Sequence, residues 1–92
     1  AFPILIKEGA PFTRKEFQIF LEKRNIQTRV VFTGNILRQP MCQNISKRVL
    51  EEGYPNADRV MARGVLLPLH HGMTESMFSR FHATVHKFIE QF

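Results

Sequence analysis

The C-terminal segment, residues 74–92, limits the possible folds more than any other part of the sequence, because its apolar residues recur at helical spacing. Alternating steps of three and four residues separate Phe78, Phe81, Val85, Phe88 and Phe92, and Met77 and Ile89 widen this stripe. Thr74 precedes the stripe and is a good N-cap residue. A helix with such a stripe must be covered by other elements, so we expect a packed domain with this helix against its core.

Three short apolar runs are typical of β-strands. The first is Phe2–Lys7, which is followed by glycine and proline. The second is Ile26–Thr33, which is rich in the β-branched residues that favour strands. The third is Val65–His70. Pro68 within it has no N–H to give to a neighbouring strand, so this strand should lie at an edge or be bulged there.

Two further helices are predicted upstream of the C-terminal one. In the first, Thr13 as N-cap and Glu16 three residues later form a capping-box pattern, and the helix should end near Asn25. The residues at helical spacing that should be buried are Phe17, Phe20 and Leu21.

The second of these helices is predicted over the stretch PNADRVMARG. Asn56 would be its N-cap, and Gly64 would stop it. Asp58 in the first turn and Arg63 in the last turn both suit the helix dipole.

Together these elements give the order β-α-β-(irregular)-α-β-α and predict a two-layer α+β or α/β architecture, with residues 1–92 forming a single domain. A chain of 92 residues with 43% hydrophobic residues is large enough for one core. The irregular part, residues 39–55, leaves two alternatives open. Either Ser46–Gly53 forms a short helix, or an irregular strand runs around Arg48–Leu50.

Composition narrows the class of protein. No apolar run approaches the roughly 20 residues that span a bilayer, and the start has no signal-peptide pattern, so we expect a cytoplasmic protein that does not contact a membrane. The lone Cys42 fits a reducing compartment, and a structural thiol is favoured over a nucleophile because no histidine lies near it in sequence. The missing initial Met and the early strand suggest a piece of a longer chain.

The charged and aromatic residues admit several kinds of ligand. A net charge of +5 suits an anionic partner, and equally a plain basic surface. The aromatic residues fall on helix stripes, where core packing explains them better than base stacking, so no nucleic acid is expected. His82 and His86 have metal-ligand spacing but no evident third ligand, and His70 and His71 should point to opposite faces of a strand, so no metal site is predicted.

The stretch FTGNILRQP, residues 32–40, places a glycine, an amide and a guanidinium at one turn of the chain. Gly34 can take the backbone angles of a sharp turn. Asn35 and Arg38 have two interpretations: they fasten the turn, or they bring hydrogen-bond donors and positive charge to a substrate. The residues themselves do not decide between the two.

The order of two stretches, TRVVFTGNILRQP and YPNADRVMARGVLLPLHHGMTE, resembles the C-terminal end of the DegT-type sugar aminotransferases, which use pyridoxal phosphate. The resemblance runs from about Phe2 to Phe92. No single motif is highly specific, but their order and spacing are. Within the family, FTGNILRQP is most similar to the nucleotide-sugar 3-dehydratases, such as those acting on CDP-4-keto-6-deoxyglucose, although transamination remains an alternative.

This resemblance implies that the chain is the small C-terminal domain of an enzyme of the aspartate-aminotransferase type (fold type I), a homodimer in which a large domain upstream holds pyridoxal or pyridoxamine phosphate. The parent enzyme would remove a hydroxyl group from a nucleotide-diphosphate sugar in deoxysugar and polysaccharide biosynthesis. The fragment alone would carry no catalytic residue, bind no cofactor and not be an enzyme, because the cofactor and the acid–base group would lie elsewhere.

The same resemblance implies substrate-binding roles for three residues of this chain. Gly34 would let the chain turn into the cleft between domains, and Asn35 would bond a sugar or cofactor oxygen. Arg38 and Arg29 would meet negative charge on the nucleotide sugar. The competing hypothesis is a freestanding α+β module that binds a ligand.

Overall fold

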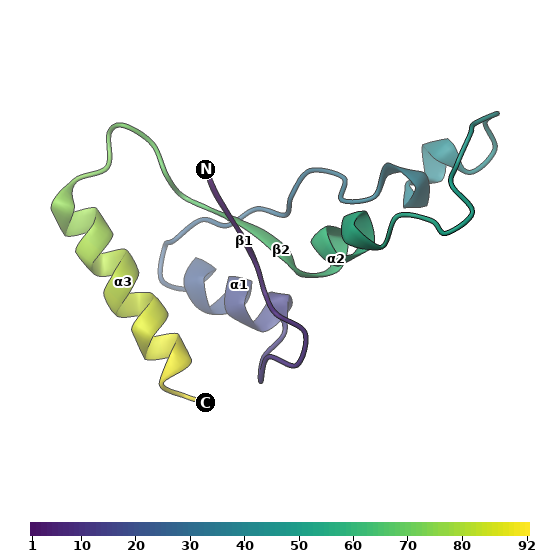
Figure 1. Ribbon diagram of the computed structural model, residues 1–92. Coiled ribbons are helices and arrows are strands. Elements are labelled where there is room, and N and C mark those ends of the chain that lie inside the picture. The colour runs from purple at the N-terminus through teal and green to yellow at the C-terminus, as the bar shows by residue number, and fades with distance from the viewer.

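A computed structural model of the chain describes residues 1–92 and shows three helices with a small sheet (Figure 1). The elements are β1 (Phe2–Leu5), α1 (Arg14–Glu22), α2 (Pro55–Arg63), β2 (Gly64–Leu67) and α3 (Glu75–Ile89), with single 3-10 turns at Ile36–Arg38 and Pro40–Cys42. The predicted mixture of helices and strands is therefore confirmed, but the sheet has two strands instead of three. None of the three helices combines the length and apolar character that a membrane crossing requires.

The two strands pair antiparallel, although they lie at opposite ends of the sequence. Phe2 is opposite Leu67, and Leu5 is opposite Gly64. Both strands are shorter than predicted. β2 ends at Leu67 instead of His70, because the next residue, Pro68, has no backbone N–H to donate to a ladder.

The prediction of a strand over Ile26–Thr33 is wrong. Only Arg29 pairs with the sheet, through two backbone hydrogen bonds with Leu66. Before it, Thr28 donates its N–H to a carboxylate oxygen of Glu22 at 2.6 Å, which ties the segment to the end of α1. After it, Phe32 turns back with a φ of +47° and donates its N–H to the carbonyl oxygen of Val30. Local partners thus take up the donors that a longer strand would need.

The helices were predicted more accurately, because their end signals are local. Thr13 caps α1 through the predicted capping box with Glu16, and Thr74 caps α3. Asn56 was wrong as the N-cap of α2. The N-cap is Tyr54, and the helix begins at Pro55, two residues earlier than predicted; the fixed φ and missing N–H of proline suit a first helical position.

Both alternatives for the irregular part are also wrong. Residues 43–54 contain neither a helix nor a strand. A turn closed by the N–H of Gly53 and the carbonyl of Leu50 stands where the helix was predicted. Every residue from Gln43 to Glu52 is exposed, and an isolated helix of eight residues is too short to be stable without packing.

The core lies between the sheet, α1 and α3. Its buried apolar side chains are Ile6, Phe17, Leu21, Ile26, Val65, Leu67 and Phe88. The rings of Phe17 on α1 and Phe88 on α3 lie 5.2 Å apart between centroids, so α3 docks on α1 through its C-terminal half. The outer residues of its predicted stripe remain partly uncovered, with Phe78 37% and Phe92 57% exposed.

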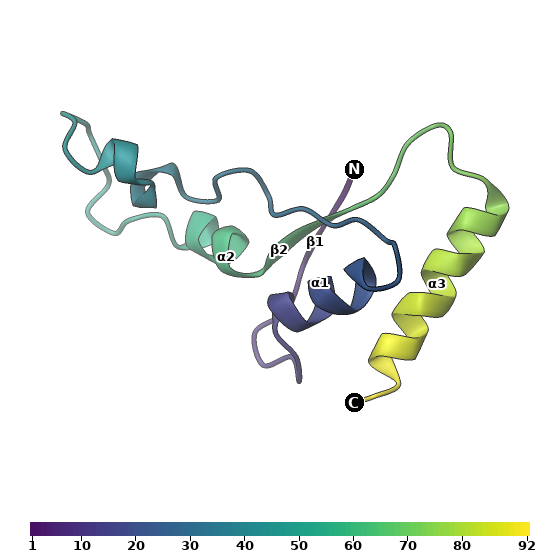
Figure 2. The same ribbon diagram turned by 180° about the vertical axis from the view of Figure 1, so that it is seen from behind.

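Residues 32–63, here called the arm, extend away from this core. Both ribbon views show α2 and the 3-10 turns on one side of the sheet and α1 and α3 on the other (Figures 1 and 2). The radius of gyration is 16.2 Å, whereas a compact domain of this length has about 12 Å. The arm is therefore held by few contacts with the core.

Candidate functional site

The predicted turn at Gly34 lies against α2, and both belong to the arm. Gly34 has a φ of +67°, which favours glycine. A Cβ atom added to it would come within 2.6 Å of Met61 Cα on α2, and closer still to Met61 Cβ. Glycine is thus required at this position for two reasons: it tolerates the positive φ, and it has no side chain to collide with Met61. The turn can therefore lie directly on α2.

Asp58 in the first turn of α2 brings Asn35 and Arg38 together. Its Oδ1 accepts hydrogen bonds from Asn35 Nδ2 at 2.9 Å and from Arg38 Nε at 2.5 Å. Its Oδ2 accepts a third from Arg38 Nη2 at 2.9 Å, so the guanidinium binds the carboxylate as a fork. The two residues are held by the domain itself, and one carboxylate sets the position of both.

This arrangement changes the ionisation of Asp58. The hydrogen bonds from Arg38, and secondly from Asn35, lower the pKa of the Asp58 carboxyl to about 2. The same bond raises the pKa of Arg38 above its ordinary value. The pair is therefore fully charged at neutral pH and locally neutral overall.

Asn35 and Arg38 differ in which of their polar atoms remain available to a ligand. Asn35 is buried, and its Oδ1 accepts the N–H of Leu37 at 3.1 Å while one N–H goes to Asp58. Arg38 has a side chain that is 61% exposed. Its Nη1 amino group makes no hydrogen bond within the chain, so Arg38 can still bind an external anion.

Arg29 does not join this cluster. Its backbone pairs with Leu66, and its side chain makes no hydrogen bond within the chain. It lines a depression of about 220 Å³ together with Gln27 and His70. The structure thus separates the predicted site residues into a pair on the arm and a single arginine beside the sheet.

Sequence reasoning missed two residues of this region. Asp58 was interpreted only through the helix dipole, and nothing in the sequence indicates that a residue 20 positions after Arg38 would bind it. Phe32 was placed in a strand, but its side chain is 85% exposed and its φ is +47°, an unusual angle for a bulky residue. Backbone strain of this kind concentrates at functional sites.

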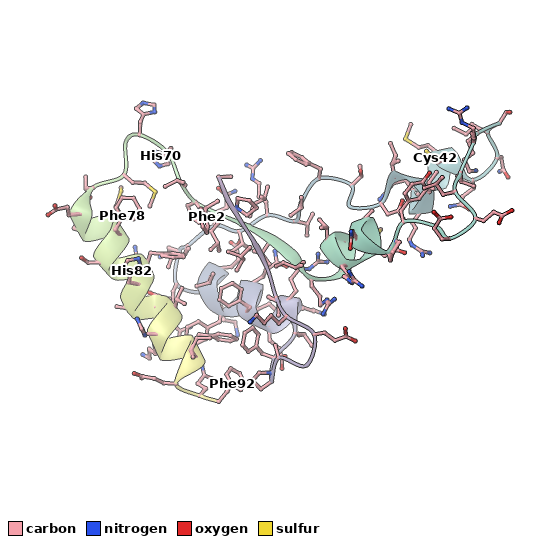
Figure 3. The ribbon with its side chains drawn as sticks, viewed as in Figure 1. Phe2, Cys42, His70, Phe78, His82 and Phe92 are labelled. Atoms are coloured by element: carbon pink, nitrogen blue, oxygen red, sulfur yellow. The ribbon has the colours of Figure 1, made fainter.

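The cysteine and the histidines that the sequence singled out form no hydrogen bond with the side chains of Asn35, Arg38 or Asp58. Cys42 is buried at the far end of the arm, whereas His70 is on the connection that leads to α3 and His82 is on α3 itself (Figure 3). No three His, Cys, Asp or Glu side chains lie close enough together to hold a metal ion.

The sequence of the chain was compared with known protein families and with individual proteins. Residues 1–86 match the model of the DegT/DnrJ/EryC1/StrS aminotransferase family. The chain is 38% identical over 73 residues to the lipopolysaccharide biosynthesis protein RfbH of Salmonella typhimurium. The matched region covers 79% of the chain and 16% of that protein. It is 34% identical over 88 residues to a dTDP-4-dehydro-2,6-dideoxy-D-glucose 3-dehydratase of Saccharopolyspora spinosa. This match covers 96% of the chain and 19% of that protein.

The chain thus spans less than one fifth of the length of either relative. The family match nevertheless includes the two predicted stretches on which the resemblance was based. The chain belongs to the DegT/DnrJ/EryC1/StrS aminotransferase family.

Proposed function

We propose that the chain is the C-terminal small domain of a longer nucleotide-sugar 3-dehydratase that depends on pyridoxal or pyridoxamine phosphate and acts in deoxysugar and polysaccharide biosynthesis. The main support is the likeness over 96% of the chain to a protein named as a sugar 3-dehydratase. The likeness to a lipopolysaccharide biosynthesis protein supports the pathway. The family description names aminotransferases, so transamination of a nucleotide sugar is the alternative.

The cofactor would be bound by the large domain and not by this chain. When bound, it supplies an electron sink for reactions next to a carbonyl group. Protein sites for it combine a lysine, or a residue in its place, with a charged partner for the ring nitrogen. Neither the depression beside Arg29 nor the neighbouring one next to Arg80 is lined by a lysine or a carboxylate, so these two depressions do not fit the cofactor.

The role of this domain would be to close the substrate cleft and meet the negative charge of a nucleotide-diphosphate sugar. Arg38 is oriented by Asp58 and keeps a free amino group, and Arg29 has an unpaired guanidinium. Asn35 is 7% exposed, and its second N–H is the group proposed for a sugar or cofactor oxygen. The large domain, and a second subunit of a homodimer, would cover apolar side chains of the arm such as Phe32 and Met41, which are 85% and 76% exposed.

Product analysis of the full-length protein tests the reaction. The protein is incubated with pyridoxamine phosphate and CDP- or dTDP-4-keto-6-deoxy sugars, and the sugar product is identified by mass. We expect a sugar product whose mass is lower by one molecule of water. A gain of an amino group would assign the aminotransferase reaction instead, and absence of cofactor binding would reject both and favour a freestanding module.

Three variants of the full-length enzyme separate contact from positioning. Arg38→Ala and Asn35→Ala should each lower kcat or raise KM while the fold is kept. Asp58→Asn leaves both side chains in place but weakens their fixed geometry. If Asn35 only helps to hold this geometry, Asn35→Ala and Asp58→Asn will have equal effects. Unchanged kinetics in both alanine variants would exclude this site from substrate binding.

A further inference from the structure

Two depressions meet on the surface where the segment before Arg29 runs past the end of β2. One has a volume of about 220 Å³ and the other about 280 Å³. They share Gln27, Pro68 and His70, so the two are continuous at these residues. Arg29 lines the smaller of the two depressions, and Arg80 from α3 lines the larger one. We call the combined surface the basic trough.

The basic trough carries positive charge without compensation. Its polar side chains are two arginines, one histidine and two amides: Arg29, Arg80, His70, Asn25 and Gln27. No aspartate or glutamate lines either depression. Every one of these side chains can donate a hydrogen bond, and the guanidinium groups suit oxyanions best. Neither arginine forms an ion pair within the chain.

The donors are partly fixed in place before any ligand binds. One amino group of Arg80 donates to the carbonyl oxygen of Arg24 at 2.5 Å, which leaves its other donors free. The Nδ1 atom of His70 accepts the N–H of Gly72 at 3.1 Å. In the neutral ring the proton must then be on Nε2, which makes that atom a donor. Figure 3 shows His70 on the connection before α3, above the helix that carries Arg80.

We propose that the basic trough is a binding site for a phosphate or diphosphate group, with one arginine supplied from each depression, Arg29 and Arg80, and with His70, which lines both, as a further donor. The two depressions are each smaller than the roughly 300–1,000 Å³ typical of sites for whole small molecules. Each depression by itself therefore fits a charged group such as phosphate and not an entire nucleotide sugar. An apolar groove lined by Phe2, Leu69 and Phe78 adjoins it at Pro68, Met73 and Phe81 and could carry less polar parts of the same ligand.

The phosphate can have two sources. It is either the diphosphate of the nucleotide sugar, in which case the inference rests on the proposed function, or free phosphate, in which case it does not. The trough shares only Arg29 with the residues proposed above for substrate binding. Arg80 and His70 are therefore the residues whose replacement tests the trough separately from the arm.

Calorimetric titration of the full-length protein with inorganic phosphate and with pyrophosphate tests the proposal. Arg80→Gln should weaken binding of the better of the two ligands about 10- to 100-fold, the usual cost of losing a charged hydrogen-bonding partner. Arg80→Lys should retain part of the affinity. Arg48→Gln is the matched control, since it removes the same charge from an exposed position on the arm and should leave binding unchanged.

The source of the phosphate follows from a second titration, with a nucleotide-diphosphate sugar. If Arg80→Gln weakens both pyrophosphate and nucleotide sugar, the diphosphate of the substrate is the ligand. If it weakens only phosphate or pyrophosphate, the trough is a separate anion site. Two results overturn the proposal: no binding of either anion to the unaltered protein, or equal binding by the Arg80→Gln and Arg48→Gln variants. Because these titrations do not depend on turnover, they stand apart from the product analysis that tests the reaction.

Discussion

Replacing Gly34 by alanine tests most directly how the arm is held. The new methyl group would meet the backbone and Cβ of Met61, neither of which can rotate away, with the Cα only 2.6 Å distant. The alanine would also have to adopt a left-handed backbone conformation, with a φ of +67°. The turn must then lift from α2 or distort, so the contacts of Asn35 and Arg38 with Asp58 should weaken with it.

The two penalties can be estimated separately. The left-handed conformation costs an alanine about 1–2 kcal/mol, and overpacking of a tight contact costs about 1–3 kcal/mol. Docking of the turn on α2 should therefore lose about 2–5 kcal/mol. Gly53 provides a matched control, because it has a similar φ of +70° but no atom within 4 Å of an added Cβ. Gly53→Ala should cost only the conformational part.

Hydrogen–deuterium exchange of the full-length protein measures the difference. The amides of α2 should exchange about 5- to 140-fold faster in Gly34→Ala than in Gly53→Ala, which corresponds to the steric part of about 1–3 kcal/mol. Amides of α1 should be unaffected in both variants, because that helix belongs to the core. Equal exchange of α2 in the two variants would refute the close approach of Gly34 to Met61.

Three further predictions concern the same region. The contribution of Asp58 to docking should be complete above the ordinary aspartate pKa of about 3.9 and should disappear as the pH falls toward about 2, the pKa of Asp58 in the folded protein. Hydrogen exchange of the α2 amides should rise over the same pH range, and Asp58→Asn should abolish this pH dependence. Arg14→Gln removes hydrogen bonds to the carbonyl oxygens of Met61 and Gly64 and should loosen the C-terminal end of α2 by about 1–2 kcal/mol in the same assay. Phe32→Gly should change protection of the turn by less than about 0.5 kcal/mol, since relief of the strained φ offsets the added freedom of glycine, whereas a loss of 1 kcal/mol or more would indicate a strand-like role for Phe32.

The helices could be predicted from the sequence because their signals lie within one or two turns. Thr13 and Glu16 specify the start of α1 without reference to any other part of the chain. The strand over Ile26–Thr33 failed for the opposite reason. Its β-branched residues suit a pleated surface, but a strand also requires backbone donors that are free to pair with the neighbouring strand. Here Glu22 and the turn at Phe32 take up the backbone donors on either side of Arg29.

The candidate site was recognised only in part, for a related reason. Glycine, asparagine and arginine in one turn are visible in the sequence, and the turn is where it was expected. The carboxylate that binds them comes from α2, 20 positions after Arg38, and the fork between them depends on how the arm folds back. A tertiary contact of this kind has no local signature, because aspartate in the first turn of a helix is already explained by the helix dipole.

The way the arm is fastened bears on what the domain can do. The turn is fixed to α2 by one close glycine contact and one carboxylate, and α2 is fixed to α1 by Arg14. These contacts are polar or steric, and none of the seven core residues belongs to the arm. Such an arm keeps its internal geometry when it moves as a unit, since its own contacts do not depend on the core. In the proposed enzyme it could therefore approach or leave the substrate cleft with Arg38 already oriented, and the exposed apolar side chains around Phe32 would be covered or uncovered by the same movement.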